Sequence, residues 1–194
     1  MQAMTRTFLA AALALALGAS PAAAQLQPED AGLVPLFLQT CTNAEMNADA
    51  TLAAVTGAAD WVETTPATVD VTQLDQVPST QMSGAYRRPE AVREWHRTVN
   101  GRTLILVIAR LPERNRYRHV CALFAPDIRN AMPYLDAMGE GMRAVGLSGR
   151  STDLPHFREY GGRFSGNRRA HAEIFSRSRA TPVQRSMHLV IAYE

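Results

Sequence analysis

Apolar residues recur at helical spacing in two short stretches near the start of the chain. Pro35 fits the first of these only if it lies in the first helical turn, where its missing N–H costs nothing. Asp49 is placed to cap the second helix. The stripe residues are Leu33, Phe37, Cys41 and Ala44 in LVPLFLQTCTNAEM, and Leu52, Val55 and Ala59 in ATLAAVTGAA.

The clearest strand pattern lies in VREWHRTVNGRTLILVIARL. Asn100–Gly101 separates two strand-like runs, and this dipeptide favours a two-residue type I′ hairpin turn. The second arm, residues 104–111, is apolar on both faces, which is typical of an interior strand. YRHVCALFA then predicts a third strand.

A third helix is expected from Asp127 onward, where Pro133 predicts a late start or a kink. Its apolar stripe comprises Ile128, Met132, Leu135, Met138 and Met142. PHFREY, AHAEIFSR and MHLVIAYE follow as three more candidate strands, and the glycine-rich GGRFSGNRR is interpreted as a loop between two of them.

The order of these elements is α-α-β-β-β-α-β-β-β, which predicts an α+β fold. We expect a mainly antiparallel sheet of about five to six strands, with helices packed on one face. A long loop is expected around residues 64–91, with a short edge strand near residues 67–71. Residues 25–194 are the right length for a single domain.

The N-terminus has the pattern of a secretory signal peptide. One charge, Arg6, precedes an apolar run, and small residues lead up to a cleavage site between Ala24 and Gln25. The apolar run is roughly half the length that a membrane-spanning helix needs. We therefore expect residues 1–24 to be removed and the mature chain to be periplasmic, or secreted, with no transmembrane segment.

The chain has two cysteines, Cys41 and Cys121. In an oxidising compartment such a pair most often forms one disulfide, which here would join the first helix to the third strand. His119 lies two residues before Cys121, on the same strand face, which leaves two rival interpretations. One is a zinc site, and the other is a cysteine nucleophile with a histidine base.

Charge is distributed unevenly. Residues 25–80 contain eight acidic residues and no arginine, whereas residues 81–194 contain nineteen arginines and ten acidic residues. The two parts either neutralise each other or leave an anion-binding surface on the second part. All twenty basic residues are arginine, which excludes mechanisms that need a lysine. The small net charge gives no sign of nucleic-acid binding.

Arginine is densest in RLPERNRYR. Guanidinium groups suit carboxylate and phosphate oxygens, so this turn is a candidate anion-binding loop. Its partner would be an anionic component of the cell envelope or an acidic protein surface, unless the acidic first segment folds across the turn. The arginines are Arg110, Arg114, Arg116 and Arg118.

No motif predicts a catalytic residue, a cofactor or a metal ligand. Two classes of function remain: a non-catalytic binding or accessory module of the cell envelope, and a small exported hydrolase or metalloenzyme. The enzyme would need the histidines of the last three strands to meet a carboxylate in one cleft. The residues concerned are His156, His171, His188, Glu159 and Glu173.

Overall fold

The computed structural model describes residues 32–42, 48–64, 91–111, 118–126, 128–150, 157–164, 168–176 and 186–194. Its helices are α1 (Leu33–Cys41), α2 (Ala48–Gly57), the 3-10 turn η3 (Met132–Tyr134) and α4 (Leu135–Ala144). Its strands are β1 (Val62–Thr64), β2 (Ala91–Val99), β3 (Arg102–Arg110), β4 (His119–Pro126), β5 (Leu147–Arg150), β6 (Phe157–Phe164), β7 (Arg168–Ser176) and β8 (Ser186–Tyr193).

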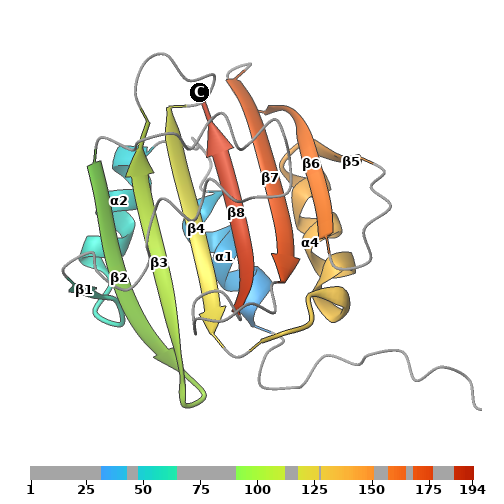
Figure 1. Cartoon of the computed structure of the whole chain (residues 1–194). Helices are drawn as coiled ribbons and strands as arrows, with labels where there is room; N and C mark the ends of the chain where they lie inside the picture. Colours follow the sequence, from blue (N-terminus) through green and yellow to red (C-terminus); the bar gives the residue numbers. More distant parts are fainter. Residues whose placement is uncertain are drawn as a thin grey trace, which may run out of the picture.

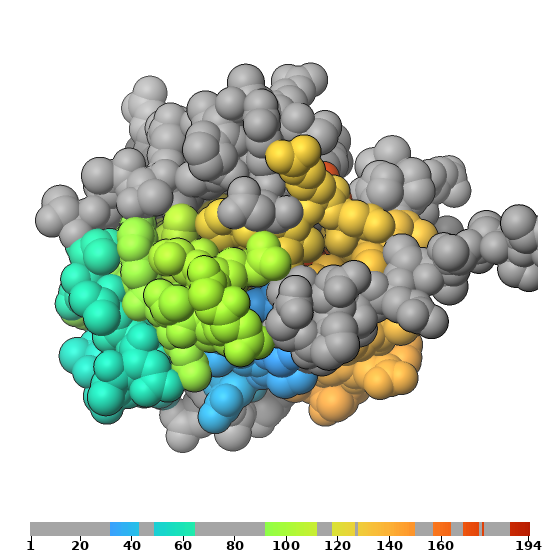
Figure 2. All heavy atoms as spheres, turned by 90° about the horizontal axis from the view of Figure 1, so that it is seen from below, coloured from blue at the N-terminus to red at the C-terminus, as the bar shows by residue number. Residues whose placement is uncertain are grey.

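The strands form one eight-stranded sheet in the order β1-β2-β3-β4-β8-β7-β6-β5, and every pairing is antiparallel. Helices α1, α2 and α4 lie on one side of this sheet (Figure 1). The view from below shows the same arrangement, with the blue, cyan and orange segments along one side (Figure 2). The predicted α+β class and one-sided helix layer are confirmed, but the sheet has more strands than the five to six expected.

Both faces of the central strands are buried. Leu104, Leu106 and Ile108 of β3 belong to the core cluster beneath the helices. Ile105 and Val107, which alternate with them, belong to a second cluster on the opposite face. This two-sided burial explains the uninterrupted apolar run and confirms that β3 is an interior strand.

The predicted hairpin between β2 and β3 is confirmed. Asn100 and Gly101 both have positive φ angles, 52° and 77°. A type I′ turn requires this conformation at both central positions, and asparagine and glycine adopt it at the lowest cost. The turn therefore fixes the register in which Val99 faces Arg102.

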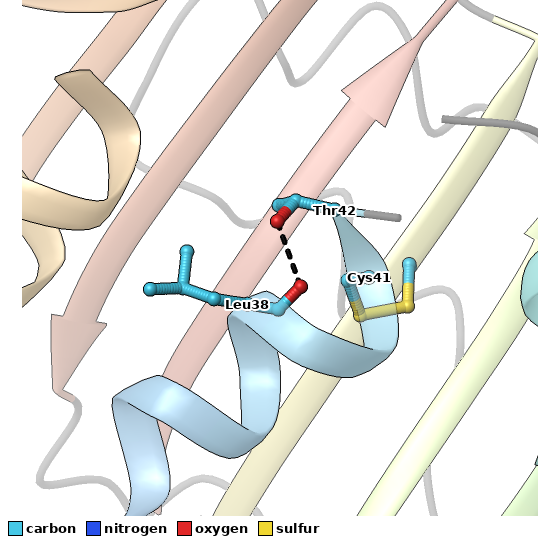
Figure 3. Close-up of a disulfide and its surroundings, with 4 residues drawn as sticks. Leu38, Cys41 and Thr42 are labelled. Carbon is cyan, nitrogen blue, oxygen red and sulfur yellow. Dashed lines mark hydrogen bonds between the residues drawn. A yellow bond between two sulfur atoms is a disulfide. The ribbon is translucent and has the colours of Figure 1, made fainter. Parts of the chain in front are cut away.

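The disulfide between Cys41 and Cys121 is confirmed, with 5.6 Å between the two Cα atoms. Neither cysteine is exposed, and the bond ties the last residue of α1 to the middle of β4 (Figure 3). The hydroxyl of Thr42 donates a hydrogen bond of 2.7 Å to the Leu38 carbonyl, and so satisfies a carbonyl in the last turn of α1. Because both sulfurs are in this bond, neither a thiolate nucleophile nor a zinc site is formed by this pair.

Several local predictions differ from the structure. Asp49 was expected to cap the second helix, but α2 begins at Ala48 and Asp49 lies in its first turn. Its carboxylate still interacts favourably with the positive end of the helix dipole. Pro133 lies in η3 and α4 begins after it, as the late-start alternative predicted. Gly161 and Gly162 are not a loop but continue β6. The edge strand expected near residues 67–71 lies outside the described residues, as does Ala44.

Two ion pairs join the acidic first segment to the arginine-rich part of the chain. Arg93 donates two hydrogen bonds of 2.7 Å to Glu63, and its guanidinium lies 4.9 Å from the ring centre of Trp95. Arg97 lies 2.9 Å from a carboxylate oxygen of Asp60. These contacts agree with the interpretation that the two oppositely charged parts pack against each other.

Candidate functional site

A cleft of about 430 Å³ lies between α4 and the edge of the sheet formed by β5 and β6. Side chains at alternate positions of a strand share a face, so Arg158 and Tyr160 of β6 both point toward the helix layer. Gly149 of β5 lies opposite Tyr160 in the pairing of the two strands. The lining residues are Leu135, Asp136, Gly139, Glu140, Arg143, Gly149, Arg158 and Tyr160.

Gly139 keeps the centre of this cleft open. A Cβ atom built on Gly139 would lie 3.5 Å from Nη1 of Arg143 and 3.6 Å from the hydroxyl of Tyr160. These are ordinary contact distances, so packing does not require glycine here. Glycine inside a helix costs roughly 0.5–1 kcal/mol relative to alanine. With no side chain at Gly139, a ligand could lie against the helix backbone here, beside the Arg143 guanidinium and the Tyr160 hydroxyl.

A second glycine in the same helix has a different explanation. A Cβ atom on Gly141 would overlap Cδ1 of Leu38 and lie 2.9 Å from Cδ2. Gly141 therefore permits the close approach of α4 to α1. Gly139 meets no such obstacle, so close packing does not explain the absence of a side chain beside Tyr160.

Tyr160 forms the floor of the cleft. Its side chain is almost fully buried, and its hydroxyl donates a hydrogen bond of 3.3 Å to the carbonyl of Leu135. Burial raises the pKa of Tyr160. The positive charges of Arg158 and Arg143 partly offset this increase, and the negative charge of Asp136 adds to it. Tyr160 is therefore a neutral phenol at pH 7, and its oxygen can still accept a hydrogen bond from a ligand.

The charged groups of the cleft have both signs. Arg143 comes from α4 and Arg158 from β6, where one nitrogen of Arg158 donates a hydrogen bond of 3.1 Å to the Phe157 carbonyl. Asp136 and Glu140 lie one helical turn apart on the same side of α4, and both are exposed. Carboxyl groups that act as general acids need desolvated surroundings, so these two favour binding of a charged group over catalysis.

The predicted anion-binding loop is described only at its ends. Arg110 ends β3 and Arg118 directly precedes β4, and both are exposed. The backbone N–H of Leu111 donates a hydrogen bond of 2.7 Å to the carbonyl of Arg118, which holds the two ends side by side. Arg114 and Arg116 lie outside the described residues, so anion binding by this loop stays a prediction.

The described histidines of the last strands do not share a site. His171 is buried on the sheet face opposite the helices, with its Nε2 atom 3.1 Å from Glu173 and 3.6 Å from Glu159. His188 packs edge-on against Phe124, and on the β7–β8 ladder it lies four positions away from the pair His171–Ala192. His156 lies outside the described residues. Within the described ranges, no group of three potential ligands is placed to hold a metal ion.

A similar pair occurs at the other end of this face. His96 contacts Glu94 through its Nε2 atom at 2.6 Å, and Thr64 donates a hydrogen bond of 3.4 Å to the same carboxylate. Glu94 is fully buried, whereas His96 is partly exposed. Both histidine–glutamate pairs thus join residues two apart on one strand and compensate buried carboxylates within the fold.

No protein-family model, curated protein or solved structure matches this chain. None of the helices in the part of the chain that the structure describes is long and apolar enough to cross a membrane.

Few features of the sequence indicate this cleft. Arg143 and Arg158 come from a helix and a strand with no motif linking them, and neither belongs to the arginine-rich turn. The one local signal was Gly139 within the stripe that runs from Leu135 through Met138 to Met142, because glycine is costly in a helix interior.

Proposed function

We propose that this protein is an exported, non-catalytic binding module of the bacterial periplasm that holds a small ligand with an anionic group in the cleft between α4, β5 and β6. The observation that carries the proposal is the missing side chain at Gly139, where a Cβ atom would lie within 3.6 Å of both the Arg143 guanidinium and the Tyr160 hydroxyl. A carboxylate or phosphate oxygen that lies here could accept a charge-assisted hydrogen bond from Arg143, and an N–H of the ligand could donate to the Tyr160 oxygen, whose own proton goes to the Leu135 carbonyl.

Location in the periplasm is proposed from the N-terminal pattern, and the disulfide supports it. Disulfides persist in oxidising compartments and are rare where glutathione and thioredoxin keep thiols reduced. The Cys41–Cys121 bond is therefore in keeping with export. The natural ligand would then be a soluble anionic component of the cell envelope, small enough to fit a cleft of about 430 Å³.

The proposal is tested by titrating the oxidised protein with succinate, inorganic phosphate and trialanine, and by recording amide chemical shifts. At least one probe is expected to produce saturable shifts concentrated on α4, β5 and β6. Arg143→Gln should weaken binding about tenfold or more, because it removes a charge-assisted hydrogen bond. Arg129→Gln is the matched control, because it removes an exposed arginine that does not line the cleft.

Gly139→Ala separates binding from stability. The added methyl group would fill the space over the helix backbone against which the ligand is proposed to lie, so binding should weaken. The same change should raise the free energy of unfolding by roughly 0.5–1 kcal/mol, because alanine replaces glycine in a helix interior. Binding that survives both Gly139→Ala and Arg143→Gln would refute the proposed site.

A further inference from the structure

We infer that the ligand of the cleft is a zwitterion, namely a peptide of two or three residues with both ends free. This inference rests on the proposed function, since it names the ligand class for the same cleft. It follows from the presence of two exposed carboxylates beside the two guanidinium groups.

The charges in the lining balance. Two arginines, Arg143 and Arg158, face two acidic residues, Asp136 and Glu140. A simple anion such as phosphate would be attracted by the arginines and repelled by the carboxylates, so half of the polar lining would oppose its binding. A ligand with an anionic and a cationic end interacts favourably with both pairs.

The two signs of charge are also separated along α4. The order along the helix is Asp136, Gly139, Glu140 and Arg143: at 1.5 Å per residue, Asp136 and Arg143 are roughly 10 Å apart and Glu140 and Arg143 roughly 4.5 Å. A peptide of two or three extended residues spans roughly 7–10 Å. Its carboxylate would lie beside Arg143 and its ammonium group toward Asp136, with the peptide backbone passing over Gly139.

The volume of the cleft agrees with a ligand of this size. About 430 Å³ lies within the usual range for small-molecule sites, roughly 300–1,000 Å³, and is far more than one phosphate or acetate ion needs. The two glycines of the lining, Gly139 and Gly149, place no side chain beside Tyr160. A Cβ atom on Gly149 would lie 3.6 Å from the Tyr160 ring. The peptide backbone could therefore lie against the ring.

The test uses four probes on the oxidised protein, with dissociation constants measured by calorimetry: trialanine, N-acetyl-trialanine, trialanine amide and inorganic phosphate. Trialanine should bind about tenfold or more tightly than either capped peptide, because each cap removes one charge-assisted contact. Asp136→Asn/Glu140→Gln should abolish the advantage over N-acetyl-trialanine and should strengthen phosphate binding. Arg143→Gln should abolish the advantage over trialanine amide.

The outcomes separate this inference from the proposed function. One outcome would be that N-acetyl-trialanine or phosphate binds as tightly as trialanine while still shifting the amide signals of α4, β5 and β6 and still losing affinity in Arg143→Gln. In that case the cleft is an anion site and the zwitterion inference is wrong. If none of the four probes binds, the proposed function is wrong as well. Tighter binding of trialanine that the Asp136→Asn/Glu140→Gln variant leaves unchanged would also overturn the inference, because the ammonium group would then be recognised elsewhere.

Discussion

Removal of the disulfide should cost this protein a large part of its stability. The bond links positions separated by 80 residues. In the chain-entropy model, a loop of this length restricts the unfolded chain enough to stabilise the native state by about 4.5 kcal/mol at 25 °C. Typical domains unfold with about 5–15 kcal/mol, so the double variant Cys41→Ala/Cys121→Ala should remain folded only marginally.

The effect is measured by urea unfolding of the wild type, both single variants and the double variant. With a urea dependence of about 2 kcal/mol per molar, the midpoint should fall by about 2 M in each variant. The double variant should be little less stable than either single, because one bond is lost in all three. Reductant should lower the midpoint of the wild type and leave the double variant unchanged. A midpoint loss below about 0.5 M would refute the loop-entropy reasoning.

Three further outcomes are expected. Expressed with its own leader in a Gram-negative host, the protein should appear in the osmotic-shock fraction with Gln25 at its N-terminus, and an intact leader in the membrane fraction would contradict cleavage. Gly141→Ala should lower the free energy of unfolding by about 1 kcal/mol, because displacing Leu38 costs about 2 kcal/mol and alanine regains only about 0.5–1 kcal/mol in a helix interior. An unchanged urea midpoint would mean that Leu38 is readily displaced. The pKa of Glu63 lies below its ordinary value because Arg93 donates hydrogen bonds to it. The Glu63–Arg93 pair therefore stabilises the folded protein fully at pH values above the ordinary pKa of glutamate, and this stabilisation is lost as the pH falls through the lowered pKa. An NMR titration should show the Glu63 pKa rising in Arg93→Gln, and equal values in both proteins would contradict this.

The sequence predicted the elements whose local chemistry allows few alternatives. Asn100–Gly101 marked the hairpin because few other residue pairs adopt two successive positive φ angles cheaply. Pro133 marked the late start of α4 because its ring excludes it from a helix interior. The expectation of an oxidising compartment and the positions of two cysteines were enough to predict the disulfide.

The elements that the sequence did not predict form mainly through contacts made elsewhere in the chain. Strand β1 has only three residues, with Val62 exposed, and β5 is the four-residue segment LSGR, so neither has a recognisable alternation. Gly161 and Gly162 have weak strand propensity, yet both pair with β5 and β7, which hold them extended. The cleft was hidden for the same reason, because the packing of α4 on the sheet edge brings Arg143 and Arg158 together.

The position of β8 has a consequence for how the chain can fold after synthesis. This strand comes last in the sequence, at Ser186–Tyr193, yet it lies in the middle of the sheet between β4 and β7. A chain that emerges N-terminus first can form the β2–β3–β4 meander, but it cannot join this to β6 and β7 until β8 has emerged. Such late, long-range closure is slow and leaves apolar strand edges exposed meanwhile. Until β8 has been made the sheet stays in two parts, and loss of β8 would leave it divided between β4 and β7.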